Sequence, residues 1–216
     1  AKGHNLMAQN TDADVLMIMN PDVILEPTCL CKLMEPLKKE NVGMVEARQT
    51  PLEHAKEYDK KTGETEWAST ACTVFKTAVY NKVNGFDADT FFLYCDDLDF
   101  SWRVRLASYK IVYMPSAVVY HAKNLSLSGT WQPTSAEIYY SAEAAMLLAY
   151  KWSNPKRAEF LCQQYLTHGG EHEQKAAQEF KKREKEGTLP EMIDPEHKIG
   201  RFLGDEYCKM RFKFNN

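Results

Sequence analysis

No long hydrophobic run occurs in this 216-residue sequence. A membrane-spanning helix needs about 20 consecutive apolar residues, and no stretch approaches that length. The opening segment, AKGHNLMAQN, also lacks the apolar centre of a secretory signal peptide. We therefore expect neither a transmembrane helix nor a cleaved leader, and we expect a cytoplasmic protein.

Cysteine pairs at metal-binding spacing are also missing. The six cysteines show no Cys-x-x-Cys spacing, which gives no indication of a zinc site or a disulfide framework. A net charge of −3 lacks the basic excess typical of nucleic-acid partners, so none is expected. In contrast, 44% hydrophobic and 12% aromatic residues exclude a disordered chain.

The first part of the chain alternates between strand and helix patterns. The apolar run at 15–19 predicts a buried strand that ends at Asn-Pro. Residues 27–39 carry apolar side chains at helical spacing, and 42–47 return to strand character. The polar residues at 48–66 predict a long loop.

The alternation continues after that loop. Residues 67–76 form a second buried segment, and 77–83 predict a short helix that ends at Asn-Gly. A helix is expected at 96–107, followed by strands at 111–114 and 117–120. The predicted fold class is therefore α/β.

Helical patterns alone follow from about residue 134. They cover 135–152, 156–168 and 171–186, with Pro or Gly between them. We predict two domains: an α/β part at 1–132 and a helical extension at 133–216.

Three acids, Asp96, Asp97 and Asp99, open the predicted helix at 96–107. Acids in a first helical turn complement the helix dipole, and Asp99 can pair with Arg103 four residues later. That explanation assigns Asp99 and Arg103 to structural support and accounts poorly for the adjacent pair. Neighbouring carboxylates repel, so one needs a hydrogen-bond donor, a cation or the raised pKa that suits a general base.

Asp22 and His121 each follow a predicted strand. Ligands in open α/β sheets bind beyond the carboxyl ends of strands, and carboxylate and neutral imidazole can both bind Mn²⁺. Each motif has a simpler explanation. Asn20-Pro21-Asp22 can be a turn, and a lone histidine is more often a hydrogen-bonded structural residue.

Taken together, these motifs resemble the family 2 inverting glycosyltransferases with the A-type fold, in particular bacterial rhamnosyl- and galactofuranosyltransferase-like enzymes. The resemblance covers about residues 1–150. It is carried, in order, by Asn20-Pro21-Asp22, Gly85-Phe86-Asp87, the aromatic run at 91–94, Asp96-Asp97, Arg103 and His121.

The resemblance implies a nucleotide-diphospho-sugar transferase sheet of Rossmann-like type, flanked by helices. It places the catalytic base on Asp97, with Asp96 beside it in a catalytic and acceptor-binding role; many relatives have Glu at that position. It implies that Asp22 and His121 hold Mn²⁺ or Mg²⁺. The implied donor-binding residues are Asn5, Asn20 and Asp22.

Trp67 precedes a buried segment of small residues and could stack on an acceptor sugar. A core or lid position is the alternative, because large aromatic side chains are commonly well buried.

One part of the family pattern has no counterpart here. The family's opening segment, with the first strand and an acid that reads the nucleotide, is missing before Gly3-His4-Asn5-Leu6. A domain without those strands would expose sheet edges and lose half of its nucleotide pocket.

The sequence therefore predicts metal-dependent inverting transfer of a hexose, with rhamnose or galactofuranose favoured, from a nucleotide-diphosphate sugar to a glycan or lipid-linked acceptor. A non-catalytic glycan- or partner-binding module and a nucleotide-sugar hydrolase are the alternatives. The basic and aromatic residues at 209–214 could make peripheral contact with an anionic membrane, or could form a solvated end.

Overall fold

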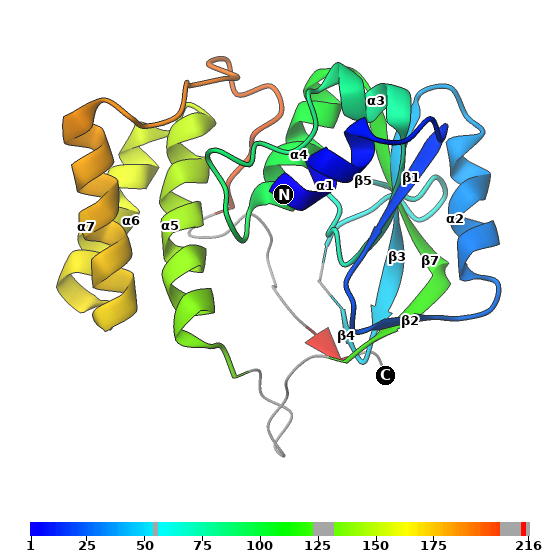
Figure 1. Ribbon diagram of the computed structural model, residues 1–216, viewed down its shortest axis with the longest axis horizontal. Helices are drawn as coiled ribbons and strands as arrows, with labels where there is room; N and C mark the ends of the chain where they lie inside the picture. The colour runs from blue at the N-terminus through cyan, green and yellow to red at the C-terminus, as the bar shows by residue number, and fades with distance from the viewer. Residues whose placement is uncertain (54–55, 123–131, 204–212, 215–216) are drawn as a thin grey trace.

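The computed structural model describes residues 1–53, 56–122, 132–203 and 213–214 (Figure 1). Its centre is a mixed sheet with the strand order β1-β6-β3-β7-β2, in which β5 also pairs with β7. The strands are β1 (Val15–Met19), β2 (Val23–Leu25), β3 (Val42–Thr50), β5 (Glu64–Thr65), β6 (Cys72–Lys76) and β7 (Lys110–His121). β3 and β7 run parallel, whereas the other neighbouring pairs are antiparallel.

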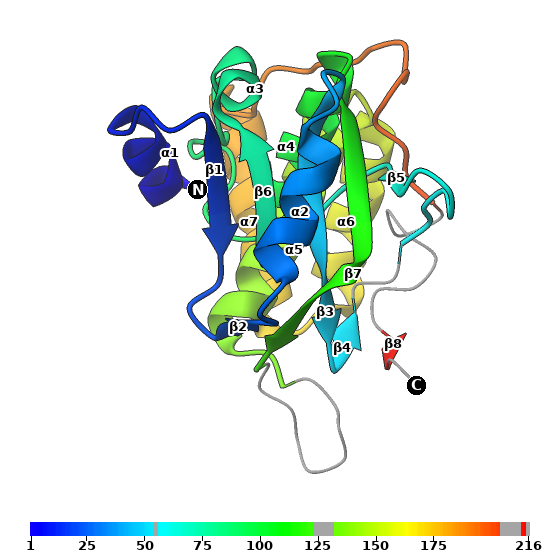
Figure 2. The same cartoon turned by 90° about the vertical axis from the view of Figure 1, so that its right-hand side faces the viewer.

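The two faces of the sheet are covered by different helices. Helix α2 (Cys29–Leu37) packs on one face, against a cluster that includes Val45 and Ala47 of β3. Met44, which points the other way, packs with residues of α1 (Lys2–Gln9), α3 (Thr77–Lys82) and α4 (Asp96–Leu106). Figure 2 shows α2 in front of the sheet and the remaining large helices behind it.

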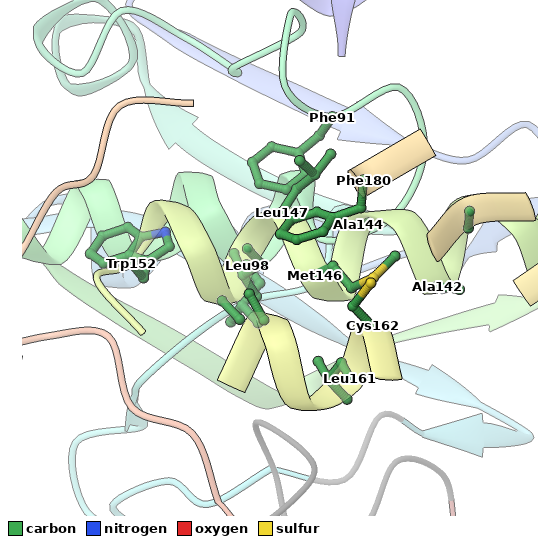
Figure 3. Packing of buried hydrophobic residues seen from close by; sticks show 14 of the residues in the cluster. Phe91, Leu98, Ala142, Ala144, Met146, Leu147, Trp152, Leu161, Cys162 and Phe180 are labelled. Carbon is green, nitrogen blue, oxygen red and sulfur yellow. The ribbon is translucent and has the colours of Figure 1, made fainter. Parts of the chain in front are cut away.

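Helices α5 (Ser135–Lys151), α6 (Pro155–His168) and α7 (Glu171–Glu186) pack on one another beyond α4. Their shared cluster includes Met146, Leu147 and Phe180, together with Leu98 of α4 (Figure 3). Phe100 of the same helix faces the sheet. Helix α4 therefore lies between the sheet and the three C-terminal helices.

A short two-stranded sheet pairs β4 (Leu52–Glu53) with β8 (Lys213–Phe214). Residues 54–55 and the basic residues at 209–212 lie outside the described residues. Within the described ranges, no helix combines the length and apolar character required to cross a bilayer.

The predicted α/β class is confirmed, and the three C-terminal helices match their predicted ranges to within one residue at each end. Two predictions were wrong. Residues 48–66 are not a continuous loop, because β3 extends to Thr50 and β4 and β5 follow. The strands predicted at 111–114 and 117–120 form one strand, β7.

Pro115 explains the apparent gap in β7. Proline cannot donate a ladder hydrogen bond, and the register against β3 shifts there: Ala47 pairs with Met114, and Arg48 pairs with Val118. The strand bends and continues to His121. The division into two domains at residue 132 stays a prediction.

Candidate active site

The end of β7 brings His121 beside Asp22. β2 pairs antiparallel with that end, with Val23 opposite His121, and the backbone amide of Ala122 donates to the carbonyl of Asp22. As a result, Oδ1 of Asp22 lies 3.3 Å from Nε2 of His121. Nδ2 of Asn20 lies 3.4 Å from the same nitrogen. Three of the residues predicted for donor or metal binding are therefore neighbours.

Gln49 determines which nitrogen of His121 is available to a ligand. Its Oε1 lies 2.7 Å from Nδ1 of His121, while its Nε2 donates to Oγ of Ser69 at 3.3 Å. An amide oxygen can only accept, so Nδ1 of His121 carries the hydrogen. In the neutral imidazole, Nε2 then carries the lone pair, 3.4 Å from Nδ2 of Asn20 and 3.3 Å from Oδ1 of Asp22.

This pair fits a divalent cation. Two acceptor atoms 3.3 Å apart repel each other unless a proton or a cation lies between them. Ligands at right angles around Mg²⁺, each about 2.0–2.1 Å from it, are about 3 Å apart. No group of three or more His, Cys, Asp or Glu suited to a metal occurs in the described part of the chain. Two protein ligands would leave the other positions to substrate phosphates and water.

Asp96 and Asp97 begin α4 after an unusual backbone segment. Tyr94 and Cys95 have φ angles of 68° and 56°, so two successive non-glycine residues are left-handed. Each such residue costs about 1–3 kcal/mol, and this kind of strain clusters at functional sites. Oδ1 of Asp97 then accepts the backbone amide of Leu98 at 2.8 Å. This left-handed turn directly precedes α4 and places Asp96 and Asp97 in the first turn of the helix.

Burial raises the pKa of Asp97 to about 7, and the neighbouring charge of Asp96 adds to the rise. The amide of Leu98 and the ammonium of Lys56 lower that pKa, but by less. Burial also raises the pKa of Asp96, against the lowering effect of the Ala1 amino group. A carboxyl group with a pKa near neutrality can take a proton from a hydroxyl at physiological pH.

A buried ion pair close to these acids was missed by the sequence prediction. Glu46 of β3 contacts the ammonium of Lys56, and their side chains are 1% and 2% exposed. Nζ of Lys56 also lies 4.0 Å from the centroid of the Trp67 ring. The signal for Glu46 was its place within the apolar run at 42–47. Lys56 stands in a polar segment that gave no such signal.

Residues 67–69 connect the two groups of site residues. The backbone amide of Ala68 donates a hydrogen bond to Oγ of Ser101 on α4 at 3.0 Å. Ser69 accepts from Gln49, which in turn holds His121. A continuous hydrogen-bonded path therefore runs from the helix of Asp97 to the Asp22–His121 pair.

Trp67 itself is 4% exposed and belongs to the hydrophobic cluster that α4 shares with the three C-terminal helices. Stacking on a sugar requires an open ring face, and the ammonium of Lys56 lies over this ring. The burial of Trp67 favours the core alternative, and the acceptor-binding role of Trp67 stays a prediction. The buried alternative describes its position.

Asn5 lies away from the Asp22–His121 pair, in contact with the loop after α3. Its Nδ2 donates to the carbonyl of Phe86 at 2.8 Å, and its Oδ1 accepts the amide of Phe86 at 2.9 Å. The hydroxyl of Tyr80 donates to the same oxygen. Both the nitrogen and the oxygen of the Asn5 side-chain amide are thus hydrogen-bonded to the backbone of this loop. The donor-binding prediction for Asn5 gains no support from this geometry.

Asp99 is fully buried and joins α4 to the end of α5. It accepts from Nε of Arg103 at 2.8 Å and from Nε1 of Trp152 at 3.1 Å, and Nζ of Lys151 lies 2.7 Å away. Arg103 also donates to the carbonyl of Gly85 at 2.7 Å. This geometry is the one expected of the structural-support role predicted for Asp99 and Arg103.

No protein-family model matches the chain. The crystal structure of GalNAc-T7 with UDP, GalNAc and Mn²⁺ superimposes with a TM-score of 0.57 at 11% sequence identity, over 88% of this chain and 41% of that one. The chain has the A-type glycosyltransferase fold. The likeness to GalNAc-T7 shows that fold and no more.

Sequence similarity to this class of transferase is local. N-acetylglucosaminyl-diphospho-decaprenol L-rhamnosyltransferase of Mycobacterium tuberculosis, from two strains, is 37% identical over 57 residues. That match covers 26% of this chain and 18% of the relative. The mannosyltransferase PcManGT from Pyrobaculum calidifontis, in complex with GDP-Man and Mn²⁺, has a TM-score of 0.49 at 14% identity, over 85% of this chain and 58% of that one. The matched segment is thus less than a fifth of the length of the rhamnosyltransferase, so the sequence similarity between the two proteins is local.

Proposed function

We propose that this chain carries the catalytic carboxylates of an inverting glycosyltransferase. The observation that carries the proposal is the pair of adjacent acids, Asp96 and Asp97, in the first turn of α4 after the left-handed turn at Tyr94 and Cys95. Burial raises the pKa of Asp97 in this pair to about 7. Asp97 takes the proton from an acceptor hydroxyl as that oxygen attacks the anomeric carbon of a nucleotide-diphosphate sugar. The attack is opposite to the departing diphosphate, so a single displacement inverts the anomeric configuration.

Asp22 and His121 are the proposed ligands of a divalent cation, Mn²⁺ or Mg²⁺. Bound there, the cation supplies positive charge for the diphosphate that leaves. Gln49 holds the His121 ring in the tautomer that directs Nε2 toward the ligand position, and Asn20 contacts the same nitrogen. The Mn²⁺ named with GalNAc-T7 and PcManGT supports this choice of cation.

Rhamnose is the favoured sugar, and a lipid-linked diphospho-sugar is the favoured acceptor, with galactofuranose transfer as the second choice. The support is the local similarity to the mycobacterial rhamnosyltransferase. Incubation with nucleotide-diphosphate hexoses and a short-chain N-acetylglucosaminyl diphosphate lipid tests this proposal. Proton NMR of the product reports the anomeric configuration. Retention of configuration, or release of free sugar without transfer, would exclude the proposed reaction.

His121→Ala should weaken Mn²⁺ binding at least about tenfold, because it removes one of two protein ligands. Isothermal titration with Mn²⁺ in the presence of a nucleoside diphosphate measures the effect. His168→Ala is the matched control, because His168 is exposed at the end of α6. Equal affinity of the His121 variant and its parent would remove His121 from the metal site.

A further inference from the structure

Glu46 and Lys56 form an ion pair in the interior of the protein. Their side chains are almost completely buried, and removing two charges from water costs several kcal/mol for each ion. A pair of apolar side chains of similar volume would be equally stable or more stable at most such positions. A buried pair at this place therefore points to a role besides stability.

The surroundings of the pair lead directly to α4. The backbone amide of Ser69 acts on the Glu46 carboxyl and lowers its pKa, and Nζ of Lys56 lies 3.4 Å from the carbonyl oxygen of Trp67. Between these two contacts, Ala68 is hydrogen-bonded through its amide to Ser101. Ser101 stands one helical turn after Asp97. The ion pair therefore lies against both ends of segment 67–69, and this segment packs on α4, the helix that carries Asp97.

We propose that Glu46 and Lys56 are positioning residues for Asp97: through Trp67 and Ala68 the buried pair holds residues 67–69 against α4, one helical turn after that carboxyl group. The catalytic consequence rests on the function proposed above. The structural and electrostatic claim concerns the folded chain alone and can be measured without turnover.

The charges that act on Asp97 come from three elements. Asp96 of α4 and Glu46 of β3 raise its pKa, and Lys56 lowers it. His4 and the Ala1 amino group act on Asp96. The lowering by Lys56 exceeds the rise caused by Glu46, so the intact pair favours the carboxylate form that accepts a proton.

The test is a titration of the Asp97 carboxyl carbon by NMR in the full chain, with the resonance assigned from Asp97→Asn. In Lys56→Met the midpoint should rise, because the cation is lost and the buried Glu46 becomes protonated. Glu46→Gln/Lys56→Met should give a similar rise, since both variants leave a neutral pair. Glu46→Gln alone should lower the midpoint, because the ammonium then acts unopposed.

Two further variants make the outcome decisive. Lys56→Arg retains the cation and should keep the midpoint close to that of the parent. Lys175→Met removes an exposed partner of Glu171 on α7 and should leave the midpoint unchanged. Midpoints that coincide in the parent and the double variant would overturn the proposal, even if one single variant failed to fold.

Activity separates this inference from the function on which it rests. If Asp97 is the base, the acidic limb of the kcat/KM profile should move with the NMR midpoint in each variant. NMR midpoints that move while the acidic limb stays in place would support the Glu46–Lys56 claim and contradict the role of Asp97 as the base.

Discussion

Asp97→Asn should lower the rate of sugar transfer by about 10²–10⁴-fold, because the amide has the shape of the carboxyl group and cannot accept the proton. Binding of metal and nucleoside diphosphate should stay close to that of the parent. Initial rates with saturating donor measure the loss, and Asp89→Asn, an exposed acid in the loop before α4, is the matched control. A loss of only a few-fold would transfer the role to Asp96 or to another group.

The pH dependence of the parent gives an independent check on Asp97. Only its carboxylate can act as the base, and its pKa is raised to about 7. Activity should therefore increase with pH up to about 7 and then level off, and it should fall about tenfold for each pH unit well below that value. A pH profile that is flat between pH 5 and 8 would contradict the assignment.

Thermal stability should change in the opposite direction to activity. The pKa of Asp97 is higher in the folded chain than in the unfolded chain, so the folded state binds the proton more tightly. Ionisation of Asp97 therefore destabilises the fold as the pH rises from about 4 to 7. Asn at position 97 cannot ionise, so Asp97→Asn avoids this loss of stability. At pH 8 the variant should melt at a higher temperature than the parent. Lost activity with a raised Tm would exclude misfolding as the cause.

The site was predictable from sequence where a local pattern determines the chemistry. Asp22 follows a short apolar strand, and His121 ends another, so both were expected at strand ends. Their meeting depends on the antiparallel pairing of β2 with β7. That pairing follows from tertiary packing, and no spacing in the sequence encodes it.

Contacts between distant segments explain what the sequence prediction missed. Lys56 looks like one charge in a polar segment, and its partner Glu46 is ten residues earlier on a central strand. Asn5 matched a donor-binding motif, although its amide holds the backbone of Phe86, 81 residues away. Trp67 was equally compatible with a sugar platform and with the core until its burial was known.

Asp99→Asn should reduce the free energy of unfolding by about 3–5 kcal/mol, because it leaves buried cations without their shared carboxylate. Arg103 and Lys151 both lie within 2.8 Å of Asp99, and Lys151 also lies 2.7 Å from Asp87. The remaining contact with Asp87 places the expected loss at the lower end of that range. Urea unfolding followed by circular dichroism measures the change.

A matched control for Asp99→Asn is Glu171→Gln, which breaks an exposed pair with Lys175 and should leave stability almost unchanged. The buried carboxylate joins α4 to α5 and, through Arg103, to the carbonyl of Gly85. Its loss should therefore loosen the start of α4, where Asp97 lies, as well as the packing of the C-terminal helices. If Asp99→Asn unfolded at the same urea concentration as Glu171→Gln, the charges around Asp99 would not hold these elements together, and apolar packing of Leu98 and Trp102 would have to account for it.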